Sequence, residues 1–327
     1  MNLFFQRSNC SLVNRLLNYK YLSKKPALFR SITGLQVPEF DSFYTQANAK
    51  YRDYETKRLN RPNRKHKVGA GYPFKLSLQD RLLMLMVYYR LYITSTLTGV
   101  LFDLDQSNVL KDIHKLEPLV KDILPLPQKL HDKARRLQSV EEIEVMFPEF
   151  KAFTDATEQE IPRPKNKQKR KTHYSGKRKR HTVKTQLTVN SKGLIVHKSR
   201  HVRGSTHDYT LYKHSHPKLP SKVQSGLDLG YLGIKEDYPH LNCVLPIKKK
   251  NPGRGKVGVK APELSDAQKA FNRELARERV VVEHTNSRVK KFLIWGGEFR
   301  NRPKRYDFMT DIVSGLINFR ILGSLTI

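Results

Sequence analysis

Three acidic residues occupy positions from which a folded chain can bring carboxylates together. Asp155 follows a short apolar run in "FKAFTDATE", and Asp228 follows another in "KVQSGLDLGY". Glu283 comes far downstream, beside Val282, at the margin of a helical apolar stripe. Two strand ends can aim the aspartates at a common point, while a helix holds the glutamate rigidly. We therefore expect one acidic cleft.

The chemistry open to such a cleft is metal-assisted phosphodiester cleavage. Carboxylates brought together repel one another, and at least one keeps its proton unless a cation neutralises the group. Mg²⁺ prefers oxygen ligands and takes one or two carboxylates from a protein. Two such ions about 3.5–4 Å apart activate an attacking oxygen and stabilise a leaving oxygen.

Each acid also has a simpler interpretation. An aspartate at a strand end often caps a turn. Glu283 can pair with Arg279, four residues earlier on the same helix, for about 0.2–0.5 kcal/mol. The residue types alone leave this choice open.

Strands must carry the two aspartates. In "HTVKTQLTV", residues Val183, Thr185, Leu187 and Val189 alternate with polar residues, which predicts a half-buried strand. "NSKG" at 190–193 then turns the chain, and "LIVHKSRHV" returns as the hairpin partner. Short strands are also expected in "KVQSGLDLGY" and "NCVLPI", with a helix between them in "HDYTLYKHS".

A long helix must carry the glutamate. Ser265 and Gln268 form an S-x-x-Q capping box at its start. Apolar residues then recur at helical spacing, at Leu264, Phe271, Leu275, Val282, Val289 and Phe292. Trp295 and Phe299 are expected in the core or at an interface. Strands followed by this helix predict a mixed sheet with flanking helices.

The N-terminal half is predicted to be helical, as a lead-in over 1–65 and a second domain over 66–145. Within the latter, Ser77 caps a helix running to about Leu91, a short helix covers 94–102, and a third begins before Val109. This is the outline of a helix-turn-helix, and equally of a packing bundle. Three acids, Asp103, Asp105 and Asp112, argue against base reading by this turn.

The charge of the chain points to an anionic partner. The 327 residues carry a formal net charge of +32 and a pI of about 10.1. A phosphate backbone is the usual partner of such a field, because each neutralised phosphate releases a counterion. No apolar run approaches the roughly 20 residues of a spanning helix. Two cysteines and a poor secretory signal indicate a cytoplasmic protein.

Two basic segments are candidates for holding that partner. Residues 163–181 lead from Asp155 into the hairpin and form either a solvated loop or a clamp on the DNA backbone, with Lys177, Lys179 and His181 as the expected contacts. Residues 248–260 are glycine-rich and suit a phosphate, although they form no Walker motif.

His207 and Asp208 have two interpretations. They can form an accessory pair beside the acidic cleft. Alternatively, Thr206 or Asp208 caps the N-terminus of the following helix.

Several segments together resemble the DDE transposases of bacterial insertion sequences, in the insertion-sequence-five-like group related to harbinger transposases. The resemblance covers about Leu76 to the C-terminus and rests on "TDATEQEIPRP", "HYSGKRKRHTVKTQLTV", "RGSTHDYTLY", "LDLGYLGI" and "ERVVVEHTNSRVKKF". The related insertion-sequence-four signature, Y-x2-R-x3-E-x6-K, is matched by Arg279, Glu283 and Lys290, and its tyrosine position holds Ala276.

The resemblance implies a ribonuclease-H-like α/β catalytic domain over 146–327, with a mixed five-stranded sheet, behind a helix-turn-helix-like domain. It places Asp155 on the first strand, Asp228 after the fourth, and Glu283 on the long C-terminal helix. These residues are then catalytic and bind two Mg²⁺ ions, for which Mn²⁺ substitutes. Arg279 and Lys290 are then contacts to DNA phosphates.

The implied function is transposition. The protein would bind double-stranded DNA at terminal inverted repeats, cleave a strand, and join it to target DNA, as a homodimer associated with the nucleoid. A noncatalytic DNA-binding protein derived from such an enzyme is the alternative. Charge alone also admits an RNA-binding protein of ribosomal type.

Overall fold

The structure, a computed structural model, describes residues 16–60, 62, 73–249 and 262–323. By internal contacts the chain divides into two units, Met1–Ile123 and Leu124–Ile327. This division differs from boundaries near residues 65 and 145, because the early helices pack against the later ones of the first unit. Most of the predicted linker at 58–73, and residues 250–260 of the second basic segment, lie outside the described residues.

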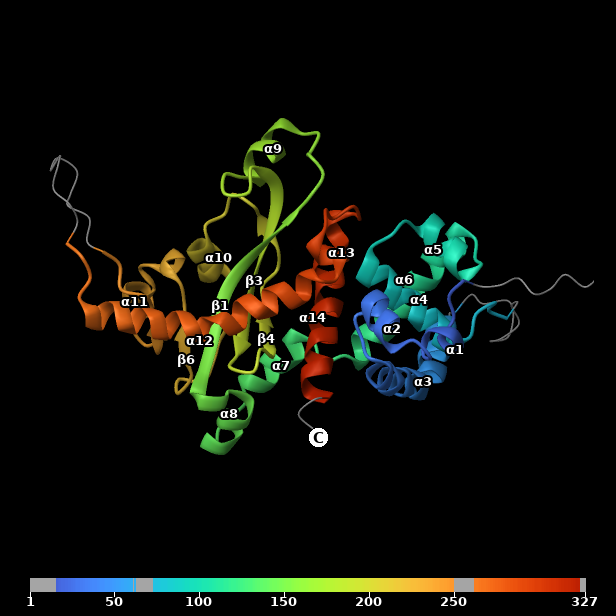
Figure 1. The fold of residues 1–327 in the computed structure, drawn as a ribbon, viewed down its shortest axis with the longest axis horizontal. Helices are drawn as coiled ribbons and strands as arrows, with labels where there is room; N and C mark the ends of the chain where they lie inside the picture. The colour runs from blue at the N-terminus through green and yellow to red at the C-terminus, as the bar shows by residue number, and fades with distance from the viewer. Residues whose placement is uncertain (1–15, 61, 63–72, 250–261, 324–327) are drawn as a thin grey trace, which may run out of the picture. The chain divides into compact units, whose positions relative to one another are not determined.

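The first unit is helical throughout its described residues. Helix α4 is buried on nearly every side and contacts α2, α3, α5 and α6. Ser77 caps α4 as predicted, and Thr94, which was expected inside the second helix, caps α5 instead; each hydroxyl accepts a backbone N–H from the first turn. The helices are α1 (Tyr19–Leu22), α2 (Pro26–Thr33), α3 (Val37–Leu59), α4 (Leu78–Leu91), α5 (Ser95–Phe102) and α6 (Gln106–Ile123) (Figure 1).

A buried ion pair ties α4 to α6. The Arg81 guanidinium, 1% exposed, donates Nε and Nη2 to the two carboxylate oxygens of Asp112 at 2.9 and 2.8 Å. It also lies 3.6 Å from the ring centroid of Phe74. Asp103 pairs with Lys75 at 2.6 Å. Asp112 therefore faces the core, so our objection to base reading was wrong for this acid, while Asp103 stays partly exposed in its ion pair.

The second unit is a mixed sheet with helices around it. Its helices are α7 (Pro127–Ala134), α8 (Val140–Met146), α9 (Lys167–His173), α10 (Asp208–Ser215), α11 (Ile234–Asp237), α12 (Asp266–Lys290), α13 (Leu293–Gly296) and α14 (Tyr306–Gly323). Its strands are β1 (Lys151–Glu160), β2 (Tyr174–Ser175), β3 (Arg180–Asn190), β4 (Ile195–Lys198), β5 (Val202–Arg203), β6 (Gln224–Gly226) and β7 (Cys243–Val244). Three single 3₁₀ turns, η1 (Pro148–Phe150), η2 (Leu229–Tyr231) and η3 (Pro303–Arg305), complete it.

The sheet is built on the long antiparallel pair β1–β3. On its far side β1 pairs in parallel with β6, and β6 with β7. The other edge of β3 pairs with β2, β4 and β5. The sheet is mixed, as predicted, but has seven strands where five were expected. The returning hairpin strand is interrupted into β4 and β5, and β2 is an additional short strand.

Strand β3 is more deeply buried than its alternation suggested. Both its apolar face and the polar residues between, including Lys184 and Gln186, are less than a tenth exposed. Neighbouring strands cover its edges, and helices contact it as well. The prediction of a half-buried strand was therefore wrong, because the second face is covered by tertiary contacts.

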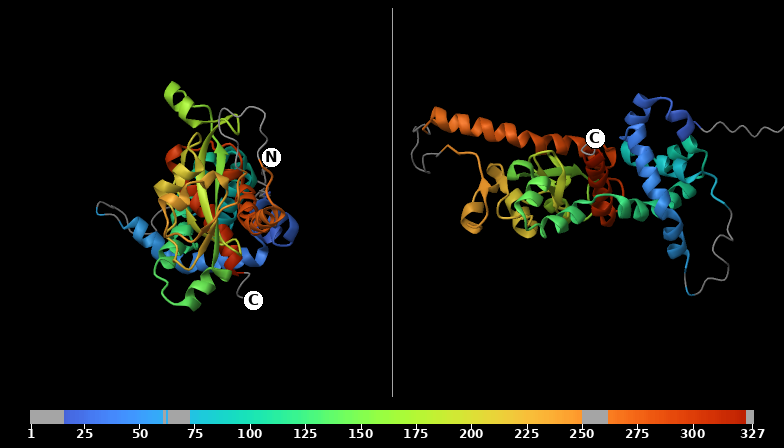
Figure 2. Two further views of the ribbon diagram at one scale, coloured as in Figure 1. Left: turned by 90° about the vertical axis from the view of Figure 1, so that its left-hand side faces the viewer. Right: turned by 90° about the horizontal axis from the view of Figure 1, so that it is seen from below.

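Helix α12 crosses β1 and β3 (Figures 1 and 2). The predicted capping box is present, with the Ser265 hydroxyl and the Gln268 side chain each accepting from the other's backbone N–H. Leu275, Val282 and Val289 are buried, but Phe271 is 42% exposed, because the first part of α12 extends past the strands. Trp295 and Phe299 are buried, as expected for the core. Within the described residues no helix is long and apolar enough to cross a bilayer.

Candidate active site

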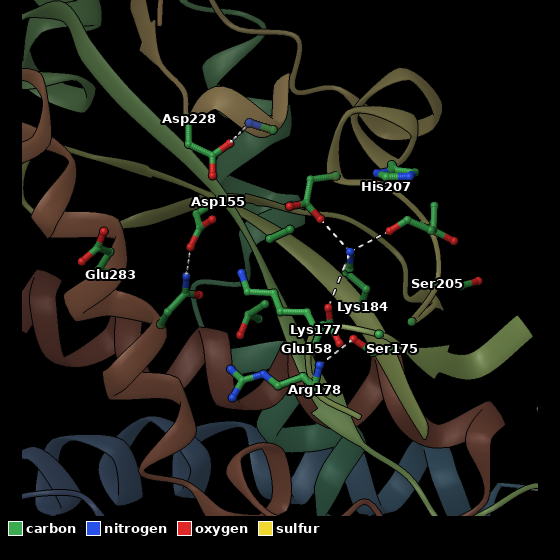
Figure 3. Close-up of a pocket in the computed structure, with 18 of the residues that line it drawn as sticks. Asp155, Glu158, Ser175, Lys177, Arg178, Lys184, Ser205, His207, Asp228 and Glu283 are labelled. Carbon is green, nitrogen blue, oxygen red and sulfur yellow. Dashed lines mark hydrogen bonds and ion pairs between the residues drawn. The ribbon is translucent and has the colours of Figure 1, made fainter. Parts of the chain in front are cut away.

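One pocket of about 740 Å³ receives all three predicted acids. Its walls come from β1, the start of β3, the β2–β3 turn, the loop before α10, the turn after β6, and α12. Figure 3 shows Asp155 and Asp228 side by side, with Glu283 apart from them on α12. The fold therefore gathers three acids, separated by up to 128 residues, around one open cavity.

Asp155 lies within strand β1 and not at its end. It pairs in register with Leu187 of β3. Asn286 Nδ2 of α12 donates to its Oδ2 at 2.8 Å, which fixes the orientation of the carboxyl group. Burial, with the nearby charge of Asp228, raises the pKa of Asp155 to about 6, although Arg279 acts in the opposite direction. The prediction of a strand-end position was wrong because β1 continues to Glu160.

Asp228 lies two residues beyond the short strand β6. It begins η2, and its Oδ1 accepts the backbone N–H of Gly230 at 2.8 Å. The turn-capping role considered from the sequence is therefore real, and the same side chain also lines the pocket. Gly230 allows this turn, because an added Cβ would lie 2.9 Å from that oxygen.

Glu283 projects from α12 into the same pocket and is exposed. The described contacts contain no ion pair between Glu283 and Arg279. Among the described residues, no three His, Cys, Asp or Glu side chains are grouped closely enough to hold a metal ion. The two aspartates are thus adjacent, whereas the glutamate is across the pocket.

The side chains fit a hard divalent cation by their chemistry. All three offer carboxylate oxygens, which suit Mg²⁺ or Mn²⁺. Burial is the main cause of the raised pKa of Asp155, and the neighbouring charge of Asp228, which a bound cation would offset, adds to it.

Two of the five predicted DNA contacts line the pocket. Lys177, in the turn between β2 and β3, is exposed, and Lys290 lies at the end of α12. Burial, together with Arg178, lowers the pKa of Lys290. Lys179, His181 and Arg279 are not among the lining residues. The His181 ring packs edge-on against Tyr174, 5.7 Å between centroids.

His207 and Asp208 both line the pocket. The N-cap of α10 is His207, and it makes no side-chain capping bond, so capping by Thr206 or Asp208 was wrong. Asp208 instead pairs with Lys184 at 2.7 Å. The described contacts contain no hydrogen bond between His207 and Asp208.

Our sequence interpretation missed four lining residues that matter here. Arg178 lies beside Lys177, and Asn286 lies one helical turn after Glu283, on the same side of α12. Both could have been found from those spacings. Lys184 and Glu158 face each other across β1 and β3, and no local signal reveals that register.

An acidic pocket on a mixed sheet, combined with a separate unit of helix-turn-helix outline, defines a DNA-processing nuclease by class. Residues 154–318 match the DDE superfamily endonuclease family, and residues 74–126 match the helix-turn-helix of DDE superfamily endonucleases. The chain belongs to this superfamily, in which the resemblance of its sequence motifs had placed it.

A curated relative agrees with this assignment. The probable transposase for insertion sequence element IS702 of Microchaete diplosiphon is 34% identical over 261 residues, covering 79% of this chain and 86% of the relative. No solved structure matches the chain significantly. The helix-turn-helix prediction is thereby confirmed for α4–α6.

Proposed function

We propose that the protein is an active transposase that binds the terminal inverted repeats of an insertion sequence, cleaves a DNA strand and transfers it to a target. The observation that carries this proposal is the shared pocket of Asp155, Asp228 and Glu283 with Lys177, Arg178 and Lys290 around it. Carboxylates there suit a cation, and the basic side chains suit the phosphates on either side of the scissile bond.

The strand order supports a ribonuclease-H-like catalytic domain. The central β1 lies between antiparallel β3 and parallel β6, with β4 and β5 outside β3 and β7 outside β6. Asp155 is on the first strand of this sheet. Asp228 follows β6, which is the fourth strand when the two-residue β2 is left out and β4 and β5 are counted as one interrupted strand. The positions agree with those that the family resemblance implies.

The catalytic residues in this proposal are Asp155, Asp228 and Glu283, which would hold two Mg²⁺ ions or Mn²⁺ in their place. Such ions, when bound, activate an attacking oxygen and stabilise a leaving one. Asn286 holds Asp155 in place through its 2.8 Å hydrogen bond. Closure of the pocket would require the Glu283 side chain to swing towards the aspartates, which its exposed position on α12 permits.

The DNA is held at two places. Lys177, Arg178 and Lys290 contact the backbone near the cleaved bond, as charged groups that recognise phosphate. In the helical unit, α6 is the recognition helix, since its first turns expose Gln106, Ser107, Asn108 and Lys111. Their amide, hydroxyl and ammonium groups match the edges of bases in the major groove.

Chemistry then proceeds in two in-line displacements. Water attacks a phosphodiester at the end of the element and releases a 3′-hydroxyl. That hydroxyl attacks a phosphodiester of the target, so no covalent bond to the protein forms. Two ends have to be joined, so we propose a homodimer acting on double-stranded DNA in the cytoplasm, at the nucleoid.

The test is cleavage of DNA carrying the element's inverted repeat, in Mg²⁺. Asp155→Asn and Glu283→Gln should each lower nicking by at least about a thousandfold, because each removes a charged ligand. Binding of the same DNA should be unchanged. Glu274→Gln, an exposed glutamate on the same helix, is the matched control and should nick normally.

The separation of Glu283 from the two aspartates favours one rival, a noncatalytic DNA-binding protein derived from a transposase. That protein would bind the repeat without cutting it in Mg²⁺ or Mn²⁺. Normal nicking by both Asp155→Asn and Glu283→Gln would show instead that the proposed site is wrong.

A further inference from the structure

A lysine inside the pocket is surrounded by oxygens in the way a bound cation would be. Lys184 Nζ donates to the Thr206 carbonyl at 2.6 Å and to Asp208 Oδ1 at 2.7 Å. Glu158 Oε1 lies 3.6 Å from it on the neighbouring strand. Figure 3 shows Lys184 on the side of Asp155 away from Glu283.

The burial of Lys184 requires an explanation. The residue is 8% exposed, and an ammonium taken out of water is costly unless it is paired and hydrogen-bonded. Its register opposite Glu158 fixes its place on β3, and Thr182 Oγ1 donates to the other oxygen of Glu158 at 2.8 Å. The lysine thus joins Glu158 and Asp208 in one network, in which its charge offsets one of the two carboxylates.

This network adjoins the three acids of the proposed catalytic centre. A Cβ placed on Gly230 would lie 2.9 Å from Asp228 Oδ1 and 3.5 Å from Asp208 Oδ2, so these two carboxylates approach the same point. Counting Glu158, the pocket holds five carboxylates. Without Lys184, a divalent ion would meet acids on both sides of Asp228.

We propose that Lys184 is a positioning residue that acts as a built-in cation. It occupies the Asp208–Glu158 side of the pocket and so confines divalent ions to Asp155, Asp228 and Glu283. This inference rests on the proposed function for the identity of the catalytic acids. The contacts of Lys184 itself are independent of the proposed function.

The experiment counts Mn²⁺ bound to the full-length protein, by electron paramagnetic resonance in the absence of DNA. Lys184→Gln keeps a hydrogen-bond donor but removes the charge, and it should bind on the order of one more Mn²⁺ per chain than the unchanged protein. Lys184→Arg retains the charge and should leave the count unchanged. The double variant Lys184→Gln with Asp208→Asn should also return to the original count.

Thermal unfolding gives a second measurement if Lys184→Gln folds poorly. Mn²⁺ should then raise its Tm by more than it raises that of Lys184→Arg, because the ion replaces the missing charge. A lysine with a purely packing role would give equal Mn²⁺ shifts. An unchanged Mn²⁺ count in Lys184→Gln, with an equal Tm shift, would overturn the inference.

The same counts separate this inference from the proposed function. If Lys184→Gln binds one more Mn²⁺ than the unchanged protein but the unchanged protein does not nick the inverted-repeat DNA in Mg²⁺ or Mn²⁺, the role of Lys184 is supported and the proposed metal-dependent function fails. If the unchanged protein binds Mn²⁺, Asp155→Asn loses it, and Lys184→Gln gains none, the proposed function survives and the inference is overturned.

Discussion

At the scale of single residues, the acidic pocket depends on how each carboxylate is held. Asp155 is oriented by Asn286, Asp228 by the backbone N–H of Gly230, and Asp208 by Lys184. No partner of Glu283 appears in the described contacts. Asp155, Asp228 and Asp208 are thus preorganised, whereas Glu283 is able to move. This suits a site that is completed when its ligand binds.

Gly230 offers a sharp test of the Asp228 position. Gly230→Ala puts a methyl group 2.9 Å from Asp228 Oδ1, so that carboxylate has to shift. We expect nicking to fall about ten- to a hundredfold, since small displacements of catalytic groups have costs of this order. Gly323→Ala is the control, because an added Cβ there meets nothing within 4 Å. Equal nicking by both variants would count against the Asp228 assignment.

Asp155 also predicts a pH dependence of stability in the absence of divalent ions. Its pKa of about 6 lies above the ordinary 3.8, so the folded state holds the proton more tightly than the unfolded state. The stability contributed by this group therefore rises as pH falls from about 6 to about 4. Asp155→Asn removes the charge and should be more stable at pH 7 by on the order of 1–3 kcal/mol.

Urea unfolding in a chelator, at pH 7 and pH 4, measures this difference. Most of the advantage of Asp155→Asn should be lost at pH 4, because the wild-type carboxyl group is then largely protonated in the folded state and partly protonated in the unfolded state. A variant that is less stable than wild type at pH 7 would contradict the raised pKa.

At the scale of elements, the helix starts were the feature that the sequence predicted best. Ser77 and Ser265 each accept an N–H of the first turn, and α4 and α12 begin where these two predicted caps place them. The burial of the strands was harder to predict. The alternation in β3 indicated that one face of the strand is buried. In the structure the second face is buried as well, because β3 also contacts β2, β4 and β5 and several helices.

The pairing of α4 with α6 depends on the buried Arg81–Asp112 ion pair. Asp112→Ala leaves a buried guanidinium without its carboxylate, which typically costs about 3–5 kcal/mol. We therefore expect a large drop in the free energy of unfolding, measured in urea, and weaker binding of the inverted repeat. Lys50→Ala breaks the exposed Lys50–Asp122 pair instead and should cost about 0–1 kcal/mol. Equal losses would mean that the buried pair contributes little.

At the scale of the whole molecule, the excess of positive charge sets the affinity for nucleic acid. A net charge of +32 favours any phosphate backbone, and counterion release makes this binding fall steeply with salt. Charge by itself does not separate DNA from RNA. The membership of the DDE superfamily and the helix-turn-helix make DNA the partner that we propose.

The basic turn between β2 and β3 should contribute to that salt dependence. Replacing Lys177 and Arg178 with alanine should flatten the slope of log K against log salt by about 1–2, because about 0.9 counterion is released per phosphate. Lys192→Ala, an exposed lysine at the other end of β3, should leave the slope unchanged. A slope unaffected by the double variant would exclude this turn from the DNA interface.

By itself, the sequence determined the types of the three acids, the ends of the main helices, the mixed sheet and the superfamily. These follow from local patterns and motifs, since caps and periodicities act within a few residues. Only the tertiary structure decided that Asp155 lies inside a strand, that Asp112 faces the core, and that Lys184 meets Glu158 and Asp208. Those features depend on strand register and on packing between distant segments, where contacts form across more than twenty residues of chain and no short pattern specifies the partner.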